Sequence, residues 1–134
     1  MFNQDQFYQY INDNKGKPFK YGVWDCFVFV SGYYKLRQGI DYFRHLRSYT
    51  TKIGYFRVLR NNGYSSVTDL MDNNFCSNSL SLVKRGDVVV YDDCLGLCDG
   101  IYSIFLNQDN NFDYSFIQTN KCGSAYIVDR ATNG

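Results

Sequence analysis

The spacing of apolar residues changes part-way along the chain, and this change limits the possible fold more than any other feature. Up to about residue 75 the apolar residues recur at helical intervals, as in Phe7, Tyr10 and Ile11. After a polar segment from Cys76 to Ser81, β-branched and aromatic runs replace that pattern, beginning with Val88 to Tyr91. Helices followed by strands predict an α+β domain in which the helices pack on one face of an antiparallel sheet.

These patterns predict four helices and five strands. The helices are expected over residues 3–14, 26–36, 50–62 and 69–74, with Asp25 and Thr68 as the caps of the second and fourth. The strands are expected over residues 88–91, 95–97, 101–106, 114–118 and 125–128, as a meander that follows a loop at residues 76–81. The sequence has 134 residues and shows no repeat or linker, which predicts one domain over residues 1–134.

Cys26 is the strongest candidate for chemistry. It follows the capping residue Asp25 and therefore lies in the first turn of a strongly apolar helix. Unpaired amides and the positive end of the helix dipole stabilise a thiolate there, which predicts a lowered pKa for the Cys26 thiol and an amide for an oxyanion. The alternative is that Cys26 is a small apolar residue buried under the sheet.

Two motifs resemble the NlpC/P60 branch of the papain-like cysteine peptidases. They are Trp24 to Val30, with an Asp-Cys pair, and Arg85 to Tyr91, with Gly-Asp before an apolar strand. The resemblance implies a papain-like fold with Cys26 as the nucleophile. In that family the next strand begins with the catalytic His, usually followed by Val-Gly-Ile-Tyr. When the strands are aligned on Gly100-Ile101-Tyr102, Cys98 occupies the position of the missing His.

The chain is still more similar to a phage-encoded family of unknown function, DUF6950, over residues 18–129. The matching residues follow the order of the family pattern: Asp25-Cys26, Asp41, Phe43-Arg44, Tyr49, Arg85-Gly86-Asp87, Leu95-Gly96-Leu97 and Ala125-Tyr126-Ile127-Val128. This resemblance implies a phage virion protein.

A thiol nucleophile of this type requires an imidazole that takes and returns a proton. His45 is the single histidine of the chain and lies between two predicted helices. A lone loop histidine without an orienting partner is expected to be a solvated surface residue, so His45 is an unfavourable base. Asp87 and Asp99 are further proton acceptors, but a carboxyl pKa of about 4 matches a thiol poorly.

Charge and composition limit the partners. The net charge of +1 gives no field that would draw the chain to nucleic acid. No apolar stretch reaches membrane length, and the first residues lack the basic and then apolar pattern of an export signal. Aromatic residues make up 19% of the chain, which suits a tyrosine-rich protein interface or an aromatic core. We therefore expect protein partners, no nucleic acid and no membrane span.

The odd number of cysteines argues against a complete disulfide framework and favours a reducing cytoplasm. The five are Cys26, Cys76, Cys94, Cys98 and Cys122. A zinc site formed by Cys94, Cys98 and Cys122 is an alternative, but the spacing is loose and the histidine is distant. Small buried residues are the favoured interpretation, and neither a metal nor a cofactor is predicted.

Two functions follow from these features. The first is a structural virion protein, associated with the tail, that keeps a peptidase-like scaffold without its chemistry. Such a protein is assembled in the host cytoplasm and binds other tail components or further copies of itself. The second is a working cysteine hydrolase that cuts peptide or amide bonds, as in peptidoglycan, with Cys26 as nucleophile and His45 or a group from a neighbouring subunit as base. The first is favoured because the imidazole is missing.

Overall fold

The computed structural model describes residues 2–108 and 113–128. Over these residues the chain forms α-helices, two short 3-10 helices and one sheet. The helices are α1 (Gln4–Asp13), α2 (Cys26–Gln38), η1 (Arg44–Leu46), α3 (Lys52–Asn61), α4 (Val67–Asn74) and η2 (Thr119–Lys121). The strands are β1 (Cys76–Asn78), β2 (Val88–Tyr91), β3 (Cys94–Cys98), β4 (Tyr102–Leu106), β5 (Tyr114–Gln118) and β6 (Ser124–Ile127).

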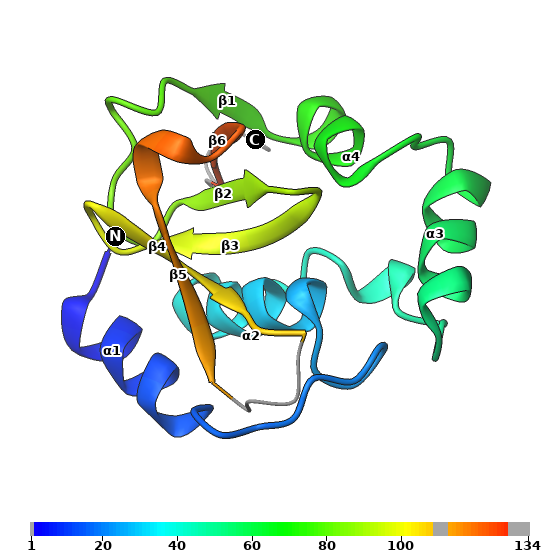
Figure 1. Cartoon of the computed structure of the whole chain (residues 1–134), viewed down its shortest axis with the longest axis horizontal. Helices are drawn as coiled ribbons and strands as arrows, with labels where there is room; N and C mark the ends of the chain where they lie inside the picture. Colours follow the sequence, from blue (N-terminus) through cyan, green and yellow to red (C-terminus); the bar gives the residue numbers. More distant parts are fainter. Residues whose placement is uncertain (1, 109–112, 129–134) are drawn as a thin grey trace.

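The sheet has the strand order β1-β6-β2-β3-β4-β5, and every neighbouring pair is antiparallel. Strands β2 to β5 form the predicted meander, but β6 returns to the other side of β2 and lies between β2 and β1 (Figure 1). The prediction of an α+β fold with an antiparallel sheet is therefore confirmed, whereas a simple meander of all strands is wrong. The assignment to the papain-like NlpC/P60 fold stays a prediction.

The main core lies between the helices and one face of the sheet. Successive side chains of a strand point to opposite faces, so Val88 and Val90 of β2 and Leu95 and Leu97 of β3 all project toward the helices. The helix α2 is buried along most of its surface, with Phe29 fully covered. The prediction that residues 26–36 form a buried helix is confirmed, and α2 ends as expected at Gly39 in a left-handed conformation.

A second, smaller cluster covers the opposite face of the sheet. It contains Val89, Cys98, Phe105, Cys122 and Ala125. A Cβ atom on Gly96 would lie 2.5 Å from Cε1 of Phe105, so glycine at this position lets the Phe105 ring close over β3. Both faces of the central strands are consequently buried.

Two local predictions are wrong. Ser66, not Thr68, caps α4, because the Ser66 hydroxyl accepts a hydrogen bond from the Asp69 amide at 3.0 Å. Residues 76–81, predicted as a loop, begin with the strand β1, which pairs with β6. This strand is polar and three residues long, so it has no apolar alternation for a sequence pattern to detect.

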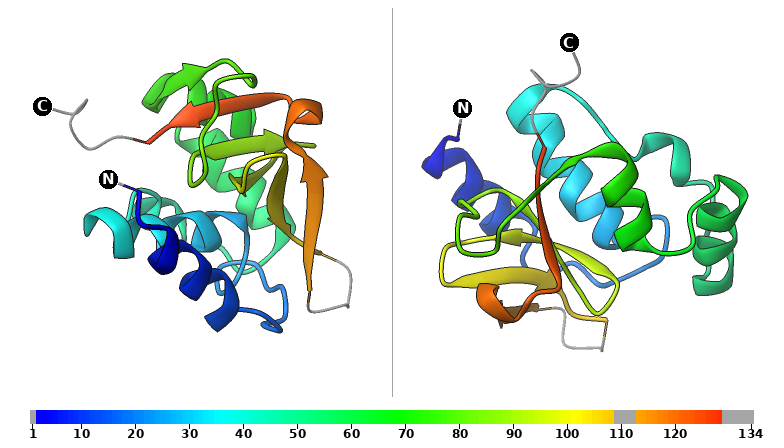
Figure 2. Two further views of the ribbon diagram at one scale, coloured as in Figure 1. Left: turned by 90° about the vertical axis from the view of Figure 1, so that its left-hand side faces the viewer. Right: turned by 90° about the horizontal axis from the view of Figure 1, so that it is seen from above.

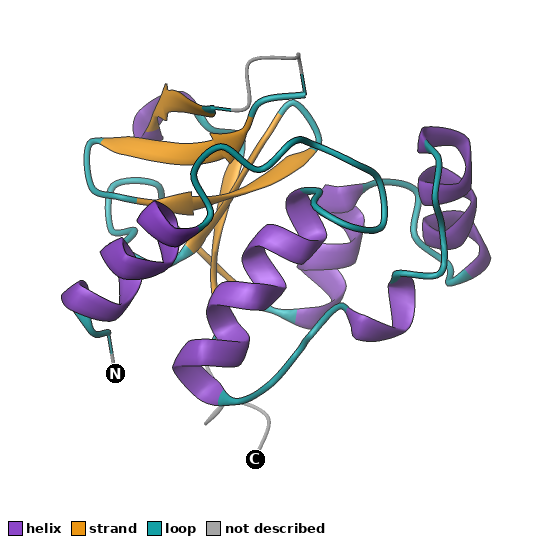
Figure 3. Ribbon diagram, turned by 90° about the horizontal axis from the view of Figure 1, so that it is seen from below, coloured by secondary structure: helices purple, strands orange, loops and turns teal. Residues whose placement is uncertain are grey.

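The helices differ in how deeply they join the core. In Figures 1, 2 and 3 the helix α2 lies against the sheet, whereas α3 lies at the outer end of the molecule. The helix α3 nevertheless buries Tyr55 and Leu59, and Tyr55 reaches the start of α2. Among the helices described, none combines the length and the apolar character needed to cross a bilayer.

Candidate functional site

Asp25 fixes the start of α2. Its Oδ1 accepts a hydrogen bond from the Val28 amide at 3.0 Å, and its Oδ2 accepts from the Gly22 amide at 2.8 Å and from the Tyr49 hydroxyl at 2.5 Å. The side chain is 3% exposed. The predicted capping role of Asp25 is confirmed, and Tyr49, which sequence analysis named without a role, proves to hold the cap from another segment.

Cys26 follows this cap and is covered by aromatic side chains. It is 7% exposed, and its Sγ lies 3.7 Å from the Tyr55 hydroxyl oxygen. The ring of Tyr55 contacts the rings of Tyr21 and Tyr49, with centroids 5.7 and 5.3 Å apart. Burial raises the pKa of Tyr55, so its hydroxyl is neutral and is not a proton acceptor for a thiol at neutral pH.

Cys94 is the cysteine that acts on the pKa of Cys26. The Cys94 sulfur accepts a hydrogen bond from Nε2 of Gln108 at 3.3 Å. The assignment of Cys98 to the position of the missing His stays a prediction.

The predicted electrostatics of Cys26 are wrong in sign. The interaction with Cys94, together with burial, raises the pKa of the Cys26 thiol well above its usual value. The same interaction lowers the pKa of Cys94. Cys26 lies at the N-terminus of α2 as predicted. However, burial and the interaction with Cys94 have the larger effect on its pKa, so the neutral thiol is favoured.

Cys98 lies in the second cluster, on the far side of the sheet from the helices. Its Sγ is 3.6 Å from the Gly100 carbonyl oxygen and 4.0 Å from the Thr119 hydroxyl. Cys122 belongs to the same cluster. Cys94 also packs against this cluster, but no group of three metal-binding side chains occurs among the described residues, so the zinc alternative finds no site there.

His45 is exposed and lies on η1. It lines a hollow of about 180 Å³ together with Tyr42, Phe43, Leu70, Asn74 and Phe75. The prediction of a solvated loop histidine agrees with this position. The two carboxylates considered as acceptors are also engaged elsewhere: Asp99 accepts from the Tyr8 hydroxyl at 2.5 Å, and Asp87 accepts from the Lys84 amide at 3.0 Å.

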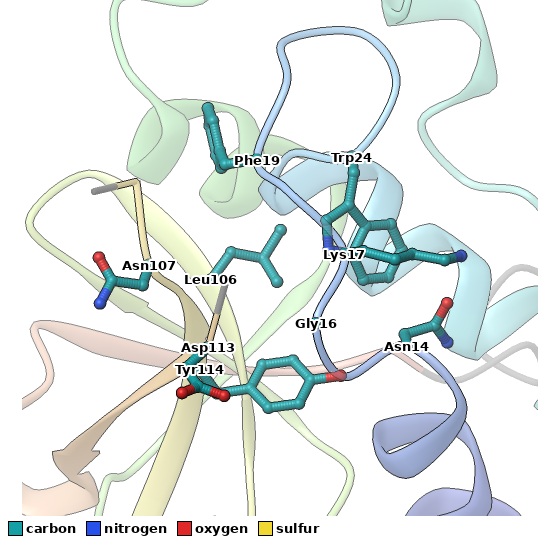
Figure 4. A pocket seen from close by; sticks show the side chains of 9 residues that line it. All are labelled: Asn14, Gly16, Lys17, Phe19, Trp24, Leu106, Asn107, Asp113 and Tyr114. Carbon is teal, nitrogen blue, oxygen red and sulfur yellow. The ribbon is translucent and has the colours of Figure 1, made fainter. Parts of the chain in front are cut away.

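Figure 4 shows a cavity beside the loop that leads to α2. Its lining consists of Asn14, Gly16, Lys17, Phe19, Trp24, Leu106, Asn107, Asp113 and Tyr114. The free volume is about 10 Å³, which is room for a single water molecule. The Lys17 ammonium lies 4.7 Å from the centre of the Trp24 ring. This cavity offers no space for a substrate.

Asp41 and Arg47 brace the segment between α2 and α3. Two parallel hydrogen bonds join them, at 2.8 and 2.6 Å, and they lower the pKa of the Asp41 carboxyl. A depressed carboxyl pKa contributes stability above the unfolded-state pKa, and this contribution is lost as pH falls through the folded-state pKa. The segment is thus predicted to loosen in acid.

We expect Asp41→Asn to lower the free energy of unfolding by about 1 kcal/mol at neutral pH. The difference from the wild type should begin to shrink as pH falls below about 4, the pKa of an unfolded aspartate, and should vanish once pH is below the lowered pKa of folded Asp41. Urea unfolding across that pH range measures both effects, with the exposed Asp13→Asn as the control. A deficit that stays constant with pH would assign the effect to packing and not to charge.

The comparison with known families identifies the chain. Residues 3–128 match DUF6950, a domain of unknown function, so the chain belongs to this family. The predicted membership is confirmed, and the match includes α1, which the resemblance over residues 18–129 omitted. No curated protein matches the sequence.

Proposed function

We propose that this protein is a structural component of a phage virion, associated with the tail, that keeps a peptidase-like scaffold without its chemistry. On this proposal it is made in the host cytoplasm and enters the particle through contacts with other tail proteins. The NlpC/P60 relationship and the phage origin are parts of the proposal and rest on the motif resemblance.

The main support for the proposal is the environment of the Cys26 thiol. Among the described residues, the side chain in hydrogen-bonding range of its sulfur is that of Tyr55, which is not an imidazole. The thiol is nearly sealed from solvent and its pKa is raised, which opposes thiolate formation. Five cavities among the described residues are lined by side chains other than Cys26 and Cys94. A peptide substrate would therefore meet a buried thiol with a raised pKa and not an activated nucleophile.

A surface at the edge of the sheet supports the interaction part of the proposal. The strand β5 pairs only with β4 among the described strands, so one side of its backbone is an open edge (Figure 2). Beside it, Ile101, Tyr102 and Phe116 are 79%, 49% and 59% exposed. They line a hollow of about 450 Å³, and Phe116 also lines a second hollow of about 350 Å³ against α1.

We call Ile101, Tyr102 and Phe116 with the open edge of β5 the β5 groove. An unpaired strand edge next to apolar hollows suits an extended segment of a partner protein, whose backbone pairs with β5 while its apolar side chains fill the hollows. The occupant proposed here is such a segment of another tail protein. Arg85 and Asp99 at the rim would orient it through polar contacts.

The alternative, a working cysteine hydrolase with Cys26 as nucleophile, has one observation in its favour. A second thiol, Cys94, acts on the pKa of Cys26, and two thiols have similar intrinsic proton affinities. The alternative therefore requires a Cys94 thiolate or a group from another subunit as base, and cleavage of peptide or amide bonds such as those of peptidoglycan.

Gene complementation separates the two functions. In a phage lacking this gene, we expect Cys26→Ser to restore the infectious titre of the wild-type gene, because the proposal gives the thiol no chemical role. Phe116→Asp should lower the titre about tenfold or more, because it places a charge in the β5 groove. Ile53→Asp is the matched control, since Ile53 is exposed on α3, away from the groove, and should leave the titre unchanged.

Loss of infectivity with Cys26→Ser, together with release of fragments from peptidoglycan by the purified wild-type protein, would overturn the structural proposal and establish the hydrolase. Equal titres for Phe116→Asp and Ile53→Asp would refute the β5 groove as the binding surface. Thermal unfolding of each purified variant shows whether a loss of titre reflects loss of folding.

A further inference from the structure

An unpaired positive charge lies at the end of α2. Arg37 is in the last turn of this helix. Its Nε and Nη1 atoms are buried, and neither donates a hydrogen bond to a described residue. Arg37 also belongs to neither of the two ion pairs found in the described part of the chain. Buried donors without an acceptor are costly, and an anion close to the guanidinium would lower that cost.

Aromatic rings hold the Arg37 guanidinium in place. Its Cζ atom lies 5.8, 6.0 and 5.5 Å from the ring centroids of Phe2, Tyr33 and Tyr34. A Cβ atom on Gly86 would lie 2.9 Å from Nη1 of Arg37, so glycine at this position lets the guanidinium lie against the backbone. Ring faces attract the cation but accept no ordinary hydrogen bond from it. The guanidinium is therefore preorganised and still lacks an anionic partner.

The same side chain lines an open hollow. Arg37 and Lys84 border a hollow of about 280 Å³, and Lys84 is exposed. The other lining residues are Gln38, Asn78, Asp87, Ile127 and Val128. This volume is much larger than one water molecule requires, so the hollow has room for a ligand group of several non-hydrogen atoms.

The charges around the hollow select the kind of anion. Arg37 and Lys84 are cations, and Asp87 is the one acidic residue of the lining. The Asp87 carboxyl is buried, accepts a hydrogen bond from the Lys84 amide at 3.0 Å, and has a pKa raised by burial. Even with Asp87 ionised, the hollow keeps a single positive charge, which one carboxylate balances. A phosphate dianion would exceed that charge and would be repelled by Asp87.

We propose that the hollow at Arg37 and Lys84 binds the carboxylate group of a ligand whose aliphatic stem lies against Ile127. The guanidinium and the ammonium supply charge-assisted hydrogen bonds to the carboxylate oxygens. The apolar side chains of Ile127 and Val128 line the hollow beside them. Free carboxylic acids and glutamate side chains of proteins both present this chemistry, and the test separates them.

The test is a titration of the full ¹⁵N-labelled chain with sodium butyrate, followed by NMR. Butyrate has one carboxylate and a short aliphatic stem. We expect saturable shifts of the backbone amide signals of Arg37, Ile127 and Val128, with a dissociation constant in the millimolar range. The neutral analogue butyramide should cause no saturable shift, and inorganic phosphate should bind more weakly than butyrate.

Two lysine variants provide a matched comparison. Lys84→Gln should weaken butyrate binding about fivefold, because it removes one of the two cations. Lys35→Gln makes the same change in net charge at an exposed position of α2 outside the hollow, and should leave the affinity unchanged. Arg37→Gln should abolish saturable binding. If Arg37→Gln does not fold, as judged by its NMR spectrum, the comparison of the two lysine variants decides the matter.

Any of three results would overturn the proposal: no saturable shift with butyrate, equal binding of butyramide, or equal affinities of Lys84→Gln and Lys35→Gln. Tighter binding of phosphate than of butyrate would also overturn it, because the hollow would then prefer a dianion. The source of the carboxylate is found with an end-blocked peptide that contains one glutamate. Tighter binding of this peptide than of butyrate, lost when glutamine replaces the glutamate, assigns the hollow to a protein side chain, and weaker binding assigns it to a free acid. Neither result depends on the proposed virion function.

Discussion

Asp25→Ala is expected to lower the free energy of unfolding by about 3 to 4 kcal/mol. The carboxylate accepts hydrogen bonds from the Val28 amide, the Gly22 amide and the Tyr49 hydroxyl. Alanine removes the cap of α2 and leaves the Gly22 and Tyr49 donors without their acceptor in a region where Tyr49 is 5% exposed. A buried donor without an acceptor bears the cost of its lost hydration. Urea unfolding measures the change as a lower midpoint at an unchanged slope.

The matched control for this prediction is Thr51→Ala. Thr51 caps α3 with one hydrogen bond to the Gly54 amide, at 3.0 Å, on an exposed surface. Its loss should cost about 1 kcal/mol, the usual value for an isolated cap. If Asp25→Ala is no more destabilising than Thr51→Ala, then the bonds from Gly22 and Tyr49 contribute nothing and Asp25 is an ordinary cap.

Gly22→Ala is expected to destabilise the protein by about 3 kcal/mol or more. Gly22 has φ of +82°, and a Cβ atom there would lie 2.2 Å from the Tyr49 carbonyl oxygen. That oxygen belongs to the backbone, so no side-chain rotation relieves the contact, and the loop must move away from the Tyr49 segment. The same movement stretches the bond from the Gly22 amide to Asp25. Thermal and urea unfolding both report the loss.

Gly63→Ala separates the cost of the steric contact at Gly22 from the cost of placing alanine at a positive φ. Gly63 has a similar φ of +90°, but a Cβ atom there meets nothing within 4 Å. Its substitution should cost about 1 kcal/mol, the penalty of placing alanine in the left-handed region. Equal effects of the two substitutions would mean that the close approach of Gly22 to Tyr49 is not a constraint on the fold.

Together these predictions treat the loop before α2 and the Tyr49 segment as one unit that sets the position of Cys26. Asp25, Asp41 and Tyr49 all form hydrogen bonds within this region. Their structural roles do not require catalysis.

Helix positions were predictable because their signals are local. The 3.6-residue period, the capping Asp25 and the terminal Gly39 all act within a few residues of one another, and α2 begins and ends close to the predicted bounds. The cap of α4 was misplaced because Ser66 and Thr68 are chemically equivalent candidates. Only the backbone path into the helix selects between them.

The strand β1 and the position of β6 were not predictable from local patterns. The residues Cys76 to Asn78 become a strand because β6 lies beside them, and β6 lies there because it returns across the sheet to pair with β2. Pairing partners that are distant in sequence leave no periodic signal in a three-residue polar segment.

The sequence by itself determined the α+β class, the buried helix, and the place of Asp25 and Cys26 at its start, because capping and hydrophobic periodicity are properties of neighbouring residues. Only the tertiary structure decided that the Cys26 thiol is buried beside Tyr55 and that its pKa is raised. The physical reason is that burial and side chains from other segments act on the sulfur at short range. Those neighbours exist only once β3 and α3 have packed against the start of α2.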